Sequence, residues 1–372
     1  MNCPRTIRYG FIVLFLLALW TPLLVTLATP HQEVSISEKR RLAPPPSLKL
    51  AEISRFPRDF EAYYNDHFGL REPLVQGYNS FQFALLNTST SKRVIVGRDG
   101  WLFQNGRDHV RDMRNLWPFS PGELQHWARV LSAKQAWLKE RGIVYIFVLT
   151  PSKPLLYPEE LPQAYQPVQP ESRADQLIDY LRNHTQVPVV DMRRALARMK
   201  RRLRPYHKTD THWNSYGAYI GYQQIIRELR KHLQDISSVS LKARDFKMSS
   251  EPGGDLARSL NLRQSVREEV PIPIDWQPSC LPSATLKGEH NDTNRNKQWF
   301  STSCEGKHHR VVMFRDSYSL AMMPYLSESF RFISYIPHSP VRLANLQEIS
   351  QQQAPDIVIE QRTSRWLRTP EG

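Results

Sequence analysis

The spacing of hydrophobic residues divides this chain into three stretches. Phe11 to Thr29 is a run of 19 residues without a charge, and a helix of that length spans roughly 28 Å, about one hydrocarbon core. Residues 52–86 repeat apolar side chains at helical spacing, which predicts an amphipathic helix whose aromatic residues simply pack. We therefore expect a membrane helix (1–30), a linker with an amphipathic helical segment (31–93) and a folded domain (94–372).

The third stretch predicts an α/β fold. Apolar runs of strand length occur at 143–149, 187–190, 310–314, 332–336 and 356–359. Segments of helical period occur at 120–141, 174–184, 213–233 and 320–326. This alternation is typical of a three-layer α/β/α arrangement, in which helices cover both faces of a mainly parallel sheet. Ligands of such sheets bind beyond the carboxyl ends of the strands, so functional side chains are expected at that edge.

The N-terminal apolar run indicates where the protein resides. Arg5 and Arg8 precede the run, and Thr26-Leu27-Ala28 is a poor cleavage site for a signal peptidase. We therefore favour an uncleaved inner-membrane anchor, with a cleaved signal and a soluble periplasmic protein as the alternative. The rest of the chain is soluble in character and follows a signal-like start, so we expect it outside the cytoplasm.

Composition and charge narrow the range of partners. The 372 residues are 40% hydrophobic and 23% charged, as in a globular protein, and the formal net charge is +14. The basic residues are scattered and no nucleic-acid motif is present, so nucleic acid is not expected as a partner. Scattered charge is typical of a solvated surface; attraction to an anionic glycan or lipid head group is the functional alternative.

Two of the three cysteines are candidates for a disulfide. Cys3 precedes the membrane segment, whereas Cys280 and Cys304 flank an irregular polar stretch that a covalent bond would help to order. An oxidising compartment would allow this pair to form. The chain has no C-x-x-C motif and no zinc-type spacing.

Two short motifs carry the candidate chemistry. Asp210 and His212 are two residues apart, so on an extended segment they share a face. Ser317 follows the predicted strand 310–314 and precedes a helix, where its hydroxyl lies near unpaired backbone N–H groups. Together these residues supply the acid, base and nucleophile of a serine acyl-transfer site. Lys153 follows the predicted strand 143–149 at the same edge of the sheet, and Trp213 would shield the Asp–His pair from water.

Each motif also has a simpler structural interpretation. Ser317 is a good helix N-cap, Asp210 can cap a turn beside a surface histidine, and Trp213 can simply pack. His207, Asp210 and His212 could instead bind a metal ion, but no second ligand cluster is evident, so no metal is expected.

Several blocks along the chain resemble the alginate O-acetyltransferases of the AlgJ and AlgX type, relatives of the DHHW proteins with an SGNH-hydrolase-like domain. The matching blocks are Ser37–Leu42, Phe60–Arg71, Gly97–Phe103, Pro151–Lys153 with the following Tyr157–Pro162 region, Asp210–Trp213, Gly254–Ala257 and Asp316–Ser319. The resemblance runs from about residue 37 to Glu360, and its specificity lies in seven blocks that occur in the family's order.

The resemblance implies roles for the matching residues. Ser317 would be the acetylated nucleophile, His212 the base and Asp210 the residue that orients it, with no cofactor. Tyr318, Arg315, Lys153 and Trp213 are candidates for contacts to the substrate or the oxyanion. Arg315 stands where the family often has glycine, so its side chain either crowds the oxyanion hole or points at an acidic substrate.

The resemblance also implies a function. A membrane-bound O-acyltransferase would deliver the acetyl group, and the chain would pass it to hydroxyls of an exported polysaccharide. A polysaccharide acetylesterase with the same three residues, and a catalytically silent binding protein of the envelope assembly machinery, remain open alternatives.

Overall fold

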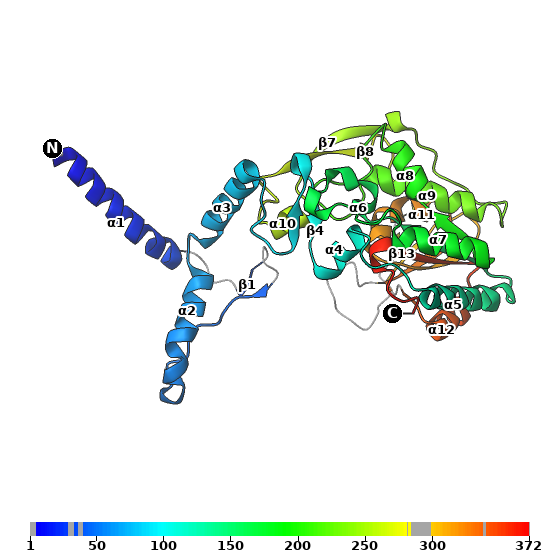
Figure 1. Ribbon diagram of the computed structural model, residues 1–372, viewed down its shortest axis with the longest axis horizontal. Helices are drawn as coiled ribbons and strands as arrows, with labels where there is room; N and C mark the ends of the chain where they lie inside the picture. Colours follow the sequence, from blue (N-terminus) through cyan, green and yellow to red (C-terminus); the bar gives the residue numbers. More distant parts are fainter. Residues whose placement is uncertain are drawn as a thin grey trace.

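The computed structural model describes residues 5–28, 33–35, 40–280, 282–283, 299–337 and 340–371. Its N-terminal helix α1 (Arg5–Ala28) projects away from the rest of the molecule (Figure 1). Within it, Ile7–Ala28 has the length and composition of a membrane-spanning helix and equally of a signal sequence. The division of the chain at residues 30 and 93 stays a prediction.

The predicted amphipathic helix 52–86 is in fact three pieces. They are η1 (Leu50–Arg55), α2 (Phe56–His67) and α3 (Arg71–Leu86). The chain bends at Gly69, whose N–H donates to Thr26 Oγ1 of α1 at 2.9 Å. A Cβ at this position would lie 2.5 Å from the Thr26 backbone nitrogen, so only glycine allows this approach. The aromatic residues of α2 stack along the helix, but Phe60 and Tyr64 remain about half exposed rather than packing in a core.

Two short hairpins precede the central sheet. One pairs β1 (Val34–Ser35) with β2 (Arg40–Arg41). The other pairs β3 (Val94–Val96) with β4 (Leu102–Gln104) across the turn η2 (Arg98–Gly100). Residues 94–96 therefore form a separate hairpin and not a strand of the main sheet.

The central sheet has seven strands in the order β6-β5-β13-β11-β12-β10-β9. Their bounds are Val189–Asp191, Val144–Thr150, Ile357–Thr363, Arg310–Phe314, Phe332–Ile336, Phe300–Ser303 and Pro282–Ser283. The first five strands are parallel, and β10 and β9 join antiparallel at one edge. The expected mainly parallel sheet is thus mixed, because the apolar runs that we recognised are the buried parallel strands and the antiparallel edge strands are short and polar.

Helices cover both faces of this sheet. Alternate residues of each strand point to opposite faces: Ile146 and Val148 of β5 join one core, and Tyr145 and Phe147 join the other. The first core is covered by α8 (Arg193–Met199), α9 (Ser215–Leu229) and α11 (Met323–Ser327). The second is covered by α5 (Pro121–Lys139), α7 (Arg173–His184) and α12 (Leu343–Gln353).

Short elements surround the carboxyl edge of the parallel strands. They are α4 (Arg107–Met113), α6 (Lys153–Leu156), η3 (Pro158–Glu160), η4 (Gln163–Tyr165), η7 (Ser317–Ala321) and η8 (Ser364–Trp366). A further hairpin pairs β7 (Phe246–Pro252) with β8 (Arg267–Pro273), and η5 (Ala243–Asp245) precedes it. The connection within this hairpin carries α10 (Asp255–Ser259) to the same edge.

Candidate active site

The turn after β11 holds Ser317 at the carboxyl edge of the sheet. Asp316 fixes this turn, because its carboxylate accepts hydrogen bonds from the Tyr318 N–H at 2.9 Å and the Thr363 N–H at 2.7 Å. The Asp316 side chain therefore caps η7, while Ser317 is the first residue of that helix. Asp316 is thus the N-cap of this helix, which leaves the Ser317 hydroxyl free to face another segment.

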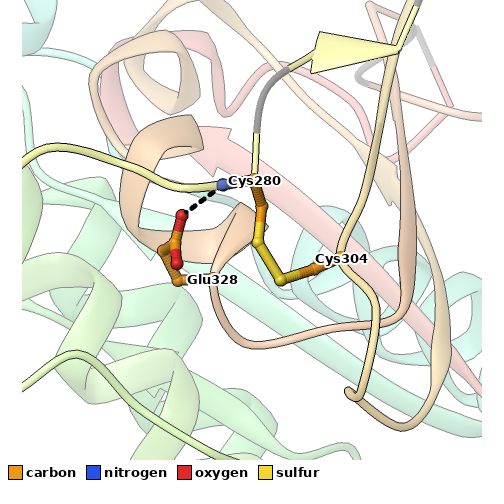
Figure 2. A group of neighbouring side chains, drawn as sticks. All are labelled: Cys280, Cys304 and Glu328. Atoms are coloured by element: carbon orange, nitrogen blue, oxygen red, sulfur yellow. Dashed lines mark hydrogen bonds between the residues drawn. A yellow bond between two sulfur atoms is a disulfide. The ribbon is translucent and has the colours of Figure 1, made fainter.

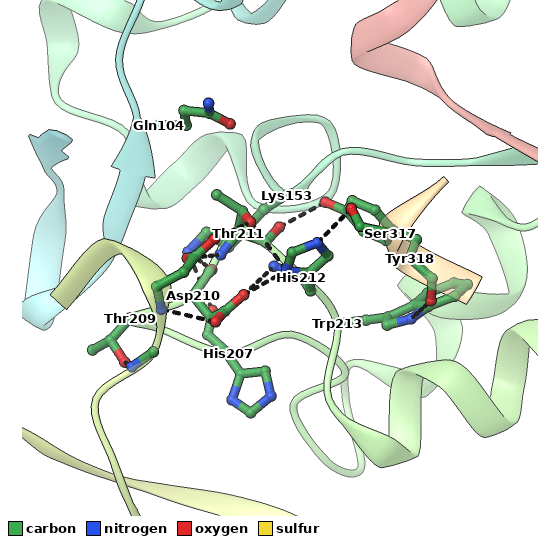
Figure 3. Close-up of polar contacts among 12 residues, drawn as sticks. Gln104, Lys153, His207, Thr209, Asp210, Thr211, His212, Trp213, Ser317 and Tyr318 are labelled. Atoms are coloured by element: carbon green, nitrogen blue, oxygen red, sulfur yellow. Dashed lines mark hydrogen bonds and ion pairs between the residues drawn. The ribbon is translucent and has the colours of Figure 1, made fainter. Parts of the chain in front are cut away.

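Asp210, His212 and Ser317 form a continuous hydrogen-bonded chain (Figure 3). His212 Nε2 lies 2.8 Å from Ser317 Oγ, and His212 Nδ1 lies 2.6 Å from Asp210 Oδ1. The His212 backbone N–H donates to the same carboxylate oxygen at 2.9 Å, as expected for two residues on one face of an extended segment. The geometry is that of a nucleophile, a base and the group that orients the base.

Asp210 is held in its ionised form. Burial of its carboxyl opposes ionisation, but the hydrogen bond and the positive potential of His212 hold the pKa of Asp210 well below its usual range. A carboxylate in this position favours the imidazole tautomer with a proton on Nδ1. The side chains of His212 and Asp210 are 26% and 21% exposed, so a small reactant can approach the pair.

Asp255 supports the site although the motifs gave it no role there. Its backbone N–H, at the start of α10, donates to Asp210 Oδ2 at 2.8 Å. Its carboxylate accepts from the Thr211 N–H at 2.8 Å and from the Thr211 hydroxyl at 2.7 Å. Burial and the charge of Asp210 raise the pKa of Asp255. The signal in the sequence was the block Gly254–Ala257, whose partner in space the sequence does not reveal.

Lys153 is a structural tether. Its buried ammonium donates to the backbone oxygens of His207, Lys208 and Asp210, at 3.2, 2.9 and 2.6 Å. It thereby holds the loop that carries Asp210 against the start of α6. Burial lowers the pKa of Lys153 to about 7 against the opposing pull of the neighbouring carboxylates. All three Lys153 donors are used on the loop, and whether Lys153 also contacts an oxyanion or a substrate stays a prediction.

Trp213 and Tyr318 join the two motifs. The indole N–H of Trp213 donates to the Tyr318 backbone oxygen at 2.8 Å, and the Tyr318 hydroxyl donates to the Thr211 backbone oxygen at 2.6 Å. The Tyr318 and His212 rings lie 4.8 Å apart. Both aromatic side chains are buried, and their hydrogen bonds fix the distance between base and nucleophile.

Arg315 does not face the open site. Its side chain is 1% exposed and its guanidinium lies over the Phe300 ring, 5.5 Å from the centroid. Burial lowers the pKa of Arg315 to about 10. Arg315 Nη1 lies 3.4 Å from the Asp316 backbone oxygen beside Ser317, and its two interpretations from the sequence, as an obstacle to the oxyanion hole or as an arm toward an acidic substrate, stay predictions.

The backbone N–H of Ser317 is the candidate hydrogen-bond donor to an oxyanion. Its N–H opens η7, and within the part of the chain that the structure describes it makes no hydrogen bond. The Tyr318 N–H is not available because it donates to Asp316. Gln104 of β4 accepts a hydrogen bond from Arg365 Nη1 at 2.8 Å. Figure 3 shows Gln104 apart from the His212–Ser317 contact.

The acidic and imidazole groups of the site also form a possible metal-ligand set. Ligand atoms of Asp210, His212 and Asp255 lie within 4.8 Å of one another. His207, which the sequence suggested as a third ligand, instead pairs through Nδ1 with Glu268 Oε1 at 2.7 Å. Both carboxylates already accept backbone N–H groups, so this arrangement suits proton transfer better than metal binding.

Cys280 and Cys304 are joined by a disulfide at the antiparallel edge of the sheet (Figure 2). Their Cα atoms are 5.1 Å apart, within the usual range for such a bond. Glu328 accepts the Cys280 N–H at 2.8 Å and ties this strand to the end of α11. Most of the polar stretch between the two cysteines lies outside the described residues.

Comparisons with known proteins agree with this fold. A family model described as "SGNH hydrolase-like domain, acetyltransferase AlgX" matches residues 94–321. A protein of Pseudomonas aeruginosa described as "Probable alginate O-acetylase AlgJ" is 26% identical over 231 residues, which are 60% of this chain and 55% of that protein. An Azotobacter vinelandii protein of the same description is 22% identical over 221 residues, 58% of this chain and 53% of that protein. The chain thus spans about half the length of these curated relatives.

Two solved structures share the architecture. PatB1 of Bacillus cereus superposes with a TM-score of 0.52 at 16% identity, over 74% of this chain and 96% of that one. A DHHW family protein of Eubacterium siraeum superposes with a TM-score of 0.51 at 15% identity, over 75% and 93% of the two chains. At these identities the likeness concerns the fold, which is an SGNH-like α/β arrangement.

Proposed function

The chain belongs to the AlgX family of SGNH hydrolase-like acetyltransferases, and on that premise we propose that it transfers acetyl through an ester on Ser317 to hydroxyls of an exported polysaccharide. The observation that carries this proposal is the position of His212, whose two ring nitrogens contact Asp210 and Ser317. The same hydrogen-bond chain activates a serine hydroxyl in unrelated acyl-transfer enzymes.

The first half of the proposed reaction forms the acetyl-enzyme. Ser317 Oγ attacks the carbonyl carbon of an acetyl ester while His212 Nε2 takes the hydroxyl proton. Asp210 stabilises the imidazolium, since its own pKa is too low for it to take the proton. The Ser317 N–H stabilises the oxyanion, and the donor's oxygen leaves with the proton from His212 as its bond to the acetyl carbon breaks.

The second half moves acetyl to the sugar. A sugar hydroxyl occupies the place of the departed donor, and His212 takes its proton as the hydroxyl oxygen attacks the acetyl carbon. The bond to Ser317 Oγ breaks, and the proton passes from His212 to the serine. Water in place of the sugar would give hydrolysis, so the outcome depends on which hydroxyl reaches the acetyl-enzyme first.

The proposed location and donor rest on α1. We place α1 in the inner membrane and the α/β domain on its extracytoplasmic side, with a membrane-bound O-acyltransferase supplying acetyl. The Gly69–Thr26 contact supports this arrangement, because it joins the end of the apolar helix to the segment that leads into the domain.

The test uses the full chain in detergent with an activated acetyl ester, followed by peptide mass analysis. We expect an acetyl mass on Ser317 that persists in buffer and disappears when an acceptor glycan is added. Ser317→Ala and His212→Ala should abolish the adduct without lowering the melting temperature. Ser319→Ala is the matched control, because the Ser319 hydroxyl donates to the Asp316 backbone oxygen and not to His212.

Other outcomes of this test would identify the chain as an esterase or as a binding protein. An adduct that clears in buffer alone would identify an esterase. No adduct, together with ester turnover that Ser317→Ala does not reduce, would identify a binding protein. A large loss of melting temperature in both Ser317→Ala and His212→Ala would mark these residues as structural.

A further inference from the structure

A cavity of about 470 Å³ lies beside the candidate active site, between α4, α6 and the segment 167–170. It shares Asp112, Ser152 and neighbouring wall residues with a smaller cavity whose far wall includes Thr211 and Arg365. Thr211 precedes the base His212, and Arg365 lies over the Tyr318 ring, 5.5 Å from its centroid. The larger cavity therefore adjoins, through the smaller one, the loop that carries His212.

The walls of this cavity are preformed. The backbone of segment 167–170 is held by the Val168 N–H, which donates to the Arg114 oxygen at 2.9 Å, and by Asn115 Nδ2, which donates to the Gln169 oxygen at 2.7 Å. Pro167 and Pro170 further restrict this segment. A cavity of this volume falls in the range of roughly 300–1,000 Å³ that small-molecule sites occupy.

The charge of the lining is one-sided. Among the described residues the larger cavity is lined by two aspartates and by no lysine, arginine or histidine. Asp175 is already satisfied, since its carboxylate accepts the Ser172 N–H and hydroxyl and pairs with Arg193. The smaller cavity is lined by His109, Lys153 and Arg365. Of these, Lys153 donates to backbone oxygens of the loop that carries Asp210, and Arg365 donates to Gln104.

Asp112 is the side chain left for a ligand. It lines both cavities, and its carboxyl makes no hydrogen bond with any residue that the structure describes. Burial raises the pKa of Asp112 to about 7, although Arg173 and Arg365 act against the rise. Asp112 is half-buried and faces the cavity, so its carboxyl can accept a hydrogen bond from a ligand hydroxyl there.

We infer that this cavity is a subsite for one sugar unit of the acceptor, and that it takes a neutral sugar through hydroxyl groups donated to Asp112 while disfavouring a uronate. This inference rests on the proposed function. A uronate carboxylate would enter a cavity without a cation and approach the Asp112 carboxyl, which costs free energy by desolvation and by like-charge repulsion. The acceptor of this chain would thus differ from a polyuronate such as alginate at the sugar held here.

The experiment compares mannotetraose with tetramannuronate of the same linkage, which differ only at the hydroxymethyl or carboxylate group of each ring. Binding to the full-length Ser317→Ala chain in detergent is measured by calorimetry at neutral pH. We expect tighter binding of mannotetraose. Adding Asp112→Ala should weaken that binding about tenfold, the effect of one lost hydrogen bond to a charged group. Adding Asp112→Asn should raise the affinity for tetramannuronate relative to mannotetraose several-fold.

Asp108→Asn in the same background is the matched control, because Asp108 is also on α4 but pairs with Arg368 and lines neither cavity. Equal affinities for tetramannuronate and mannotetraose would overturn the inference. It would also be overturned if the Asp112 variants and the Asp108 control changed the affinities equally, or if neither sugar bound. The measurement needs no turnover, so its failure leaves the Ser317 acetylation test unaffected. If Ser317 were not acetylated, the measured sugar preference of the cavity would still hold.

Discussion

Gly254 sets the position of the acid in the candidate site. A Cβ on this residue would lie 2.4 Å from Asp210 Cβ and 2.7 Å from Asp210 Oδ2. Contacts that short force the neighbour to move. The next residue, Asp255, donates its backbone N–H to Asp210 Oδ2, so the backbone of Gly254 and Asp255 fixes the side of the carboxylate opposite His212.

Gly254→Ala should therefore impair catalysis more than stability. The methyl group displaces the Asp210 carboxylate, and a shift of about 1 Å in a catalytic group costs on the order of 100-fold in rate. The measurement is kcat/KM for acetyl transfer together with the melting temperature. Gly122→Ala is the control, because a Cβ there meets no atom within 4 Å. Full activity of Gly254→Ala would show that the acid tolerates displacement.

Asp112 predicts a pH dependence of stability. Its carboxyl has a pKa of about 7 in the folded protein, raised by burial, against about 3.9 in an unfolded chain. The folded state therefore holds a proton that the unfolded state releases, so the Asp112 contribution to stability is full below about pH 4 and lost as pH rises through 7. Denaturant unfolding should show Asp112→Asn gaining stability relative to the original protein between pH 4 and 7. A constant difference across that range would contradict the raised pKa.

The residues of the site were predictable from the sequence only where the side chain itself carries the chemistry. Asp210, His212 and Ser317 stand out by type and position. Asp255 and Gly254 act largely through a backbone N–H and through a missing side chain, and neither leaves a chemical signature in sequence. Lys153 was assigned to the right edge of the sheet, but its contacts to the loop were not predictable, because its acceptors are backbone oxygens.

At the scale of elements, the parallel strands were predicted well and the antiparallel strands β10 and β9 were missed. β5, β11 and β12 agree with the predicted runs to within about one residue, because burial on both faces demands continuous apolar side chains. β13 continues beyond the apolar run through Glu360 to Thr363, all of them buried. Lys134 Nζ meets Glu360 at 2.8 Å, and this partner from a distant helix makes a polar strand end possible.

The loop that carries Asp210 and His212 depends on α6 for its shape, and Lys153→Met tests this dependence. The substitution removes a donor from three backbone oxygens, of which only that of Lys208 keeps another among the described residues, the Leu102 N–H, so we expect a loss of about 1–3 kcal/mol in the free energy of unfolding and a lower kcat. Chemical denaturation and steady-state kinetics measure the two effects. A variant of unchanged stability whose KM alone rises would instead assign Lys153 to the substrate.

At the scale of the whole molecule, the three-layer domain is closed at its antiparallel edge by the disulfide. Cys280 and Cys304 are 24 residues apart, and they connect β10 to the segment that follows the β7–β8 hairpin. This edge lies outside the parallel strands that carry the site, so the bond supports the fold without touching the chemistry.

Reduction of this disulfide should lower stability and leave the acetyl-enzyme reaction intact. A loop of this length contributes roughly 3–4 kcal/mol by restricting the unfolded chain. Unfolding is followed with and without reductant, and Cys280→Ser/Cys304→Ser in the absence of reductant provides the control. Two free thiols in protein purified from an oxidising compartment would contradict the pairing.

His212 and Ser317 lie 105 residues apart in the sequence, and in the described part of the chain their segments meet through the His212–Ser317 hydrogen bond and through contacts of Trp213 and Tyr318. An unfolded chain therefore carries no activated serine hydroxyl. Nucleophilic reactivity at Ser317 arises only with the tertiary fold, so a newly made chain cannot attack acyl groups before it has folded.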